Sequence, residues 1–205
     1  MSELYLSARS STASVTILVA RARHSLRGGP ARSRLAALCF LLLLVVGACE
    51  RDTGTTMTTP NGSRLELPQG VEAVQFPAGT VQIQSGGTTH TLRAEFATTP
   101  AQRERGLMYR TSMPEDAGML FIYPDEQEGG FWMYNTLIPL GIAYADGEGV
   151  IFQITQMEPC ESPYASMCPT YPARAPFRYA LEVNPGYYAA RGIQPGDRIL
   201  YEIVD

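Results

Sequence analysis

The pattern of hydrophobic and polar residues divides the chain into three parts. Twelve consecutive apolar residues fill positions 35–46, and alternation with a period of two recurs from about residue 71 onward. Such alternation is typical of half-buried β-strands. The stretch between them is rich in Thr, Gly and Pro and has almost no apolar periodicity, which is typical of a flexible linker. We therefore expect a leader at 1–48, a flexible tether at 49–70 and a single β-rich domain at 71–205.

Eight short strands are expected within this domain. Two alternating runs, 81–84 and 90–96, are separated by Gly86-Gly87, which predicts a β-hairpin. Asp146-Gly147 is a second hairpin signal. The remaining apolar runs that predict strands lie at 118–123, 131–135, 137–145, 150–157, 177–183 and 199–203.

Two brief helices interrupt the strands. Thr99 is a suitable N-cap, and Gln102 completes a capping box in a helix that should end near Gly106. Asn184-Pro185 begins a second helix that should end at Gly192. Many short strands with two short helices predict a mainly β fold, either a small antiparallel sandwich or a partly closed barrel.

The apolar run 35–46 is too short for a transmembrane helix, which needs about 20 residues, and is typical of a signal peptide. Arginines precede it, as expected for an exported chain. It ends in Val46-Gly47-Ala48-Cys49, which resembles the lipobox of bacterial lipoproteins. We expect cleavage before Cys49 and lipidation of that cysteine; the alternative is ordinary secretion with cleavage near Ala48.

Export determines the compartment and the partners that we expect. The lipid would make the membrane one partner and place the domain outside the cytoplasm, facing the periplasm, and Glu50 after the cysteine favours the outer membrane. Of 16 Arg and Lys and 20 acidic residues, six arginines and one acid lie before Cys49, which leaves ten arginines against nineteen acids. This acidic balance argues against a nucleic-acid partner, which would need a clustered basic face.

Cys160 and Cys168 are expected to form a disulfide, because an oxidising compartment favours the bond. Closing this loop should stabilise the domain by about 2.5 kcal/mol in the chain-entropy model. A redox pair or a soft-metal site is the alternative, although the spacing matches neither. Methionines could bind Cu(I), but Met119 and Met133 lie in strands, where methionine fills core gaps. His90 is the only histidine after Cys49, so we expect no metal and no cofactor.

Trp132, Asn135 and Thr136 form the most suggestive cluster for ligand binding. A tryptophan followed by an amide and a hydroxyl at a strand end can line a pocket in which the ring stacks on a ligand. A core tryptophan beside a polar turn is the alternative. Charge for the same pocket could come from Arg105, Arg110 and Glu182, which would otherwise be solvated or paired on the surface.

Five segments occur in the order of a known family pattern: Gly106–Arg110 (GLMYR), Gly118–Phe121 (GMLF), Phe131–Leu140 (FWMYNTLIPL), Tyr179–Glu182 (YALE) and Gly192–Asp197 (GIQPGD). This pattern resembles the uncharacterised prokaryotic family called domain of unknown function 192, over residues 80–205. The family commonly has Asp where this chain has Gly141, and often Lys where it has Tyr134. The resemblance therefore implies that this member lacks two charged groups of its relatives.

We expect a lipid-anchored cell-envelope module that binds a small molecule or glycan. No Gly-x-Ser-x-Gly motif and no phosphate-binding glycine loop is found in the sequence, which favours binding over catalysis. An envelope hydrolase acting on carbohydrate or cell-wall material remains an alternative, because the separation of carboxylates depends on the fold. A structural or assembly factor is the third alternative.

Overall fold

The computed structural model describes residues 55–204, which are mainly β-sheet with two short α-helices. The helices are α1 (Pro100–Arg105) and α2 (Tyr187–Ala190). The strands are β1 (Thr55–Thr58), β2 (Arg64–Leu67), β3 (Ala78–Ser85), β4 (Thr88–Ala97), β5 (Arg110–Ser112), β6 (Ala117–Gln127), β7 (Gly130–Trp132), β8 (Leu140–Ala145), β9 (Ile151–Met157), β10 (Thr170–Pro172), β11 (Phe177–Val183) and β12 (Arg198–Val204). The predicted leader and Cys49 lie outside the described residues. Within 55–204, no helix has the length and hydrophobicity needed to cross a bilayer.

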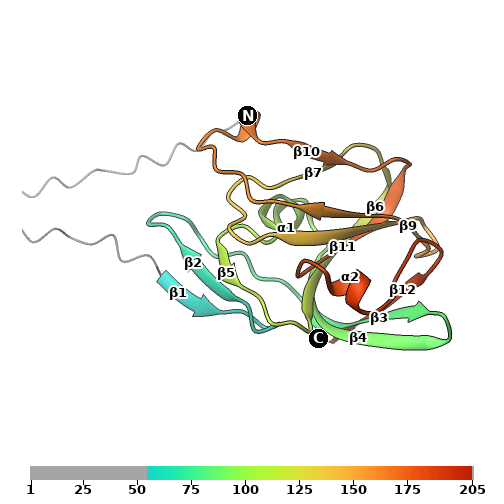
Figure 1. The fold of residues 1–205 in the computed structure, drawn as a ribbon. Helices are drawn as coiled ribbons and strands as arrows, with labels where there is room; N and C mark the ends of the chain where they lie inside the picture. The colour runs from blue at the N-terminus through green and yellow to red at the C-terminus, as the bar shows by residue number, and fades with distance from the viewer. Residues whose placement is uncertain (1–54, 205) are drawn as a thin grey trace, which may run out of the picture. The chain divides into compact units, whose positions relative to one another are not determined.

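A seven-stranded sheet with the order β12-β3-β4-β6-β11-β8-β9 forms the centre of the domain (Figure 1). All its neighbouring strands are antiparallel except β4 and β6, which are parallel. Two smaller sheets, β1-β2-β5 and β7-β10, accompany it. The large sheet does not close into a barrel. The predicted mainly β fold is therefore confirmed in its sandwich-like form.

Local signals in the sequence predicted several of these elements correctly. β3 and β4 form the expected hairpin around Gly86-Gly87. Thr99 and Gln102 form the predicted capping box at α1, which ends at Gly106. Cys160 and Cys168 form the predicted disulfide. Short-range geometry decides each of these features, and this explains why the sequence alone was sufficient.

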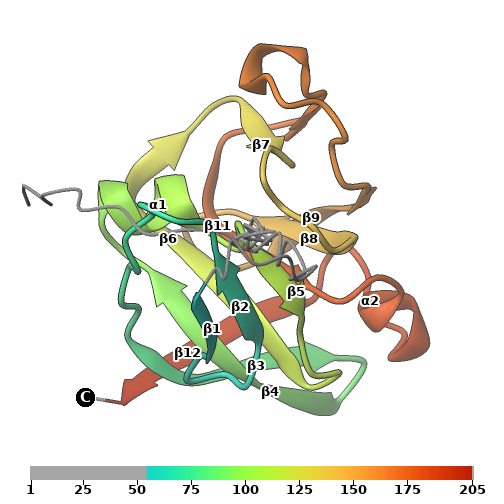
Figure 2. The same cartoon turned by 90° about the vertical axis from the view of Figure 1, so that its left-hand side faces the viewer.

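The prediction of a flexible tether over 49–70 is wrong for residues 55–67, which form the hairpin β1–β2. β2 pairs in turn with β5, and Figure 2 shows these three strands lying across the large sheet. Leu65 and Leu67 are buried, while Arg64 and Glu66 are exposed. A strand of four residues is too short to show this alternation against a polar background.

The two faces of the large sheet bury different cores. On one face Leu120 and Leu181 pack with Tyr188 of α2. On the other face Met119 and Phe121 pack with Met133, which follows β7. Met119 and Met133 are fully buried, so they fill the core as predicted. Both smaller sheets contact this second face, on which the pocket described below also lies.

One row of residues across three strands of this second face contains two carboxyl groups. Glu95 of β4 lies beside Met119 of β6, and Met119 lies beside Glu182 of β11. Neighbouring strands are about 4.8 Å apart, so the Cα atoms of the two glutamates are about 10 Å apart. Both are buried, with 0% and 4% of the residue exposed.

Glu95 forms a buried ion pair with Arg110, the first residue of β5. Arg110 Nη2 lies 2.7 Å from Glu95 Oε2, and both side chains are almost fully buried. Burial disfavours both charged forms, which raises the pKa of Glu95 and lowers that of Arg110, while their mutual attraction opposes both shifts. Arg110 Nη1 also donates a hydrogen bond to Thr59 of the hairpin. The ion pair therefore joins the large sheet, β5 and the hairpin β1–β2.

Replacing Arg110 should leave Glu95 buried without its ion-pair partner and so destabilise the domain. We expect Arg110→Met to lower the free energy of unfolding by about 3–5 kcal/mol, because Glu95 loses its compensating charge. The double variant Arg110→Met/Glu95→Met should recover most of the loss. Urea denaturation of the full chain measures both. Arg93→Met, which breaks the exposed pair with Asp116, is the matched control and should cost less than about 1 kcal/mol. Equal effects of Arg110→Met and Arg93→Met would contradict this account.

Candidate functional site

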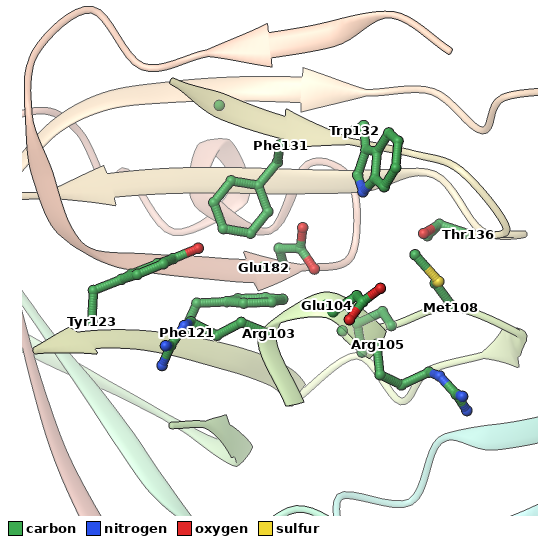
Figure 3. A pocket seen from close by; sticks show the side chains of 13 residues that line it. Arg103, Glu104, Arg105, Met108, Phe121, Tyr123, Phe131, Trp132, Thr136 and Glu182 are labelled. Atoms are coloured by element: carbon green, nitrogen blue, oxygen red, sulfur yellow. The ribbon is translucent and has the colours of Figure 1, made fainter. Parts of the chain in front are cut away.

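A pocket of about 160 Å³ lies between α1 with its following turn and the strands β6, β7 and β11. Glu182 of β11 and Thr136 contribute polar side chains, while Phe121, Phe131 and Trp132 contribute aromatic rings. Figure 3 shows these side chains surrounding one space. The pocket therefore brings together residues that are up to 79 positions apart, from Arg103 to Glu182.

Glu182 is the most unusual group in the pocket. Its residue is 4% exposed, and no hydrogen bond or ion pair to its carboxyl group is found among residues 55–204. Burial raises the pKa of Glu182 to about 8 from its ordinary value of 4.5. The side chain is therefore protonated and uncharged at neutral pH. A buried carboxyl group without a partner in a pocket is a frequent property of functional sites.

The surroundings of Glu182 explain its raised pKa. Phe121 and Phe131 meet edge to face, with their ring centroids 4.8 Å apart. Figure 3 shows the carboxyl group of Glu182 beside these two rings, on the side that faces Met108 and Trp132. Apolar walls of this kind stabilise an ionised carboxylate poorly, so the proton is retained.

Trp132 forms part of the pocket rim. It is 44% exposed, and its ring centroid lies 5.7 Å from that of Tyr134 at an angle of 44°. Met133 between them points into the core and is fully buried. The alternation of this segment thus leaves Trp132 with an accessible ring beside the pocket, and the alternative of a core tryptophan does not hold.

Three charged residues of α1 also line the pocket: Arg103, Glu104 and Arg105. Arg103 donates hydrogen bonds to the carbonyl oxygens of Thr98 and Ile122, at 2.7 and 3.0 Å. Arg105 donates one to the carbonyl oxygen of Glu72, at 2.8 Å. Both arginines are therefore held at the rim by protein contacts, and in the part of the chain that the structure describes neither forms an ion pair.

Two interlocked turns hold the walls of the pocket in place. Tyr109 and Asn135 both adopt left-handed backbone conformations, with φ of 64° and 56°. The backbone N–H of Tyr109 donates to the carbonyl oxygen of Asn135, and the Asn135 amide donates to the Tyr109 hydroxyl, each at 2.8 Å. Left-handed backbone costs energy in residues other than glycine, so these contacts must offset it. They hold the segments that carry Met108 and Trp132 beside each other in the pocket wall.

The predicted site residues therefore divide into two groups. Trp132, Thr136 and Glu182 line the same pocket. Asn135 braces the turn beside it, and Arg110 is occupied in the ion pair with Glu95. Sequence reasoning missed the pocket residues Met108, Phe121, Tyr123 and Phe131, because their apolar alternation is the same as that of core residues.

The two positions at which the chain departs from the family pattern lie in different places. Gly141 pairs with Val183 in the neighbouring strand and lies near Tyr188, on the face of the sheet opposite to Glu182. The missing aspartate therefore removes no charge from this pocket. Tyr134 replaces the lysine and lines a second pocket, which adjoins the first. Among the described residues, no group of three or more His, Cys, Asp or Glu is placed to hold a metal ion.

Comparison with known proteins supports the family resemblance. The profile of the family DUF192, described as "Uncharacterized ACR", matches residues 81–201. A putative transcription regulator from Sinorhizobium meliloti 1021 is similar in structure, with 35% sequence identity and a TM-score of 0.57, over 63% of this chain and 98% of that chain. A protein of unknown function from Novosphingobium aromaticivorans DSM 12444 has 27% identity and a TM-score of 0.55, over 73% of this chain and 94% of that one. No curated protein matches the chain.

Glu182 should make the domain less stable as the pH rises. Its folded-state pKa of about 8 lies above its ordinary value of 4.5, so its favourable contribution is complete below pH 4.5 and is lost as the pH rises through 8. We expect Glu182→Gln to raise the free energy of unfolding at pH 7 by about 3 kcal/mol and to flatten the profile between pH 5 and 8. Denaturant titrations at several pH values measure both. Glu104→Gln, which removes an exposed carboxylate from the same pocket, should leave the slope in place. Parallel profiles for wild type and Glu182→Gln would contradict the burial of an unpaired carboxyl group.

Proposed function

The chain belongs to the uncharacterised family DUF192, and we propose that its domain is a small-ligand-binding module with its site at the Glu182 pocket. The observation that carries this proposal is the buried carboxyl group of Glu182, which faces the cavity without a protein partner. Because Glu182 lines the pocket, a ligand there can supply the hydrogen bond that the described residues do not. Trp132 at the rim adds an accessible apolar surface for the same ligand.

One observation favours a hydrolase as the second candidate. Glu104 lines the same pocket as Glu182 and is exposed, so the two carboxyl groups experience opposite environments. Many glycosidases use such a pair, in which the buried group donates a proton and the exposed one is ionised. Hydrolysis of an oligosaccharide by wild type that Glu104→Gln abolishes, while binding is retained, would favour the hydrolase.

We also propose that the domain is displayed outside the cytoplasm on a lipid anchor at Cys49. The apolar run 35–46 and the lipobox-like residues 46–49 support this location, and a disulfide between Cys160 and Cys168 suits an oxidising compartment. The net acidic charge after Cys49 counts against nucleic-acid binding. The description of the Sinorhizobium protein as a putative transcription regulator therefore does not extend to this chain in our proposal.

Trp132 should be needed for ligand binding. In a screen of metabolites and glycans, we expect a subset to raise the melting temperature of the wild type, and Trp132→Ala to weaken binding of those hits at least tenfold. Tyr164→Ala is the matched control, because Tyr164 is 66% exposed and does not line the pocket. Hits that bind equally well to wild type and Trp132→Ala would place the site elsewhere. A complete lack of hits would count against the binding function.

Cys49 should determine how the protein associates with membranes. We expect the wild type expressed in a bacterium to incorporate a labelled fatty acid and to sediment with membranes, because stable anchoring needs more than one acyl chain. Cys49→Ser should abolish both properties. Cys160→Ser is the control for loss of a thiol and should keep the label. A Cys49→Ser protein that still carries the label would refute the anchor.

A further inference from the structure

A second pocket adjoins the Glu182 pocket at Trp132. It has a volume of about 370 Å³, within the usual range for ligand sites of about 300–1,000 Å³. Four residues line both pockets: Glu104, Arg105, Met108 and Trp132. The two pockets are therefore neighbours, and a ligand that extends past Trp132 would occupy both. A single small ring would fill only one of the two pockets.

The second pocket provides aromatic surface along its length. Tyr109 and Tyr134 line it, and the Tyr134 ring lies at an angle of 44° to the partly exposed ring of Trp132. Tryptophan and tyrosine combine a large apolar face with a polar atom at the edge. Ligands whose rings have apolar C–H faces and hydroxyl groups at the edge complement such a surface.

The charges around the two pockets disfavour a charged ligand. Arg103 and Arg105 lie at the rim with Glu104, and Glu182 inside is uncharged at neutral pH. A cation would meet two guanidinium groups against one carboxylate. An anion could meet the guanidinium groups of Arg103 and Arg105 only at the rim, because Phe121, Phe131 and the uncharged carboxyl group of Glu182 offer it no positive charge further in. An uncharged polar ligand avoids both penalties.

The hydrogen-bonding capacity of Glu182 suits a hydroxyl group. A protonated carboxyl group has one donor and retains acceptor sites, and a hydroxyl group likewise donates and accepts. One ligand hydroxyl can therefore accept a hydrogen bond from the protonated carboxyl group and donate one to it.

We infer that the ligand is an uncharged oligosaccharide that spans both pockets, with one sugar hydrogen-bonded to Glu182 and the chain stacked on Trp132 and Tyr134. This inference rests on the proposed binding function and specifies its ligand class. The sugar at Glu182 occupies the smaller pocket, and the following sugars occupy the larger pocket beside Tyr109.

Chain length provides the first test. The full chain is titrated calorimetrically with neutral β-linked glucose and N-acetylglucosamine oligomers of one to four sugars. We expect affinity to rise with length until both pockets are filled. Tyr134→Ala should lower the affinity for the longer oligomers about three- to tenfold. It should leave monosaccharide binding unchanged, because it removes a stacking surface only in the second pocket. Affinity that does not change with length would overturn the two-pocket site.

The pH dependence provides the second test, and its sign depends on the ligand class. Arg103, Glu104 and Arg105 of α1 and Tyr123 of β6 line the pocket with Glu182, and Tyr144 of β8 lies close by. Tyr188 of α2 lies behind the sheet. The ion pair of Glu95 and Arg110 lies on the same face of the sheet as Glu182. Burial raises the pKa of all three tyrosines above their ordinary value, so they stay neutral between pH 6 and 9. Over this range we expect oligosaccharide affinity to fall about tenfold as Glu182 loses its proton. Glu182→Gln keeps a donor at every pH and should bind with a flat profile.

A cationic probe separates failure of this inference from failure of the proposed function. Tetramethylammonium that binds more tightly as the pH rises, and is lost in Glu182→Gln and Trp132→Ala, would confirm the pocket as a binding site and overturn the oligosaccharide. A short neutral peptide that binds in place of the sugars and depends on Tyr134 would do the same. Absence of binding by every probe, with Glu182→Gln folded and stable, would overturn both.

Discussion

The ion pair between Glu95 and Arg110 is the interaction on which the other parts of the site depend. Glu95 belongs to the large sheet, whereas Arg110 follows directly after the turn that carries Gly106, Leu107 and Met108 into the pocket wall. The same guanidinium group binds Thr59 of the hairpin. Since a buried charge tolerates little displacement from its partner, this pair fixes the distance between the sheet and the wall that closes the pocket. The pair is also incompletely satisfied, because Glu95 Oε1 and Arg110 Nε have no hydrogen-bond partner among residues 55–204.

Glu95 and Glu182 show how the environment gives one residue type two roles. Glu95 and Glu182 lie on either side of Met119 and face the same side of the sheet. An arginine compensates the first, whereas aromatic rings surround the second and keep its proton in place. An unpaired buried carboxyl group reduces stability at neutral pH, and proteins usually retain such a cost where activity requires it. The cost therefore supports a functional reason for Glu182 better than a structural one.

The success of the sequence predictions depended on the range of the interactions involved. Gly86-Gly87, the capping box at Thr99 and the disulfide Cys160–Cys168 are set by residues close in sequence, and these features were predicted correctly. Trp132 and Glu182 were both singled out, but they lie on strands of different sheets, β7 and β11, and only the folded domain places them in one cavity. The partner of Arg110 could not be inferred, because Glu95 and Arg110 lie on strands of two different sheets and meet only in the folded domain. Phe121 and Phe131 look like core residues in any alternating pattern, and only the fold shows that they also line the pocket beside Glu182.

The hairpin β1–β2 also limits the distance between the domain and a membrane anchor at Cys49. Because β1 begins at Thr55, only residues 50–54 separate it from Cys49. A polypeptide extends by at most about 3.6 Å per residue, so a lipid at Cys49 would leave about 20 Å of leash between the bilayer and the first strand. A domain held this closely would search a thin layer along the membrane surface and not the depth of the surrounding space. Only ligands that are present in that layer, dissolved or attached to the envelope, would reach the pocket.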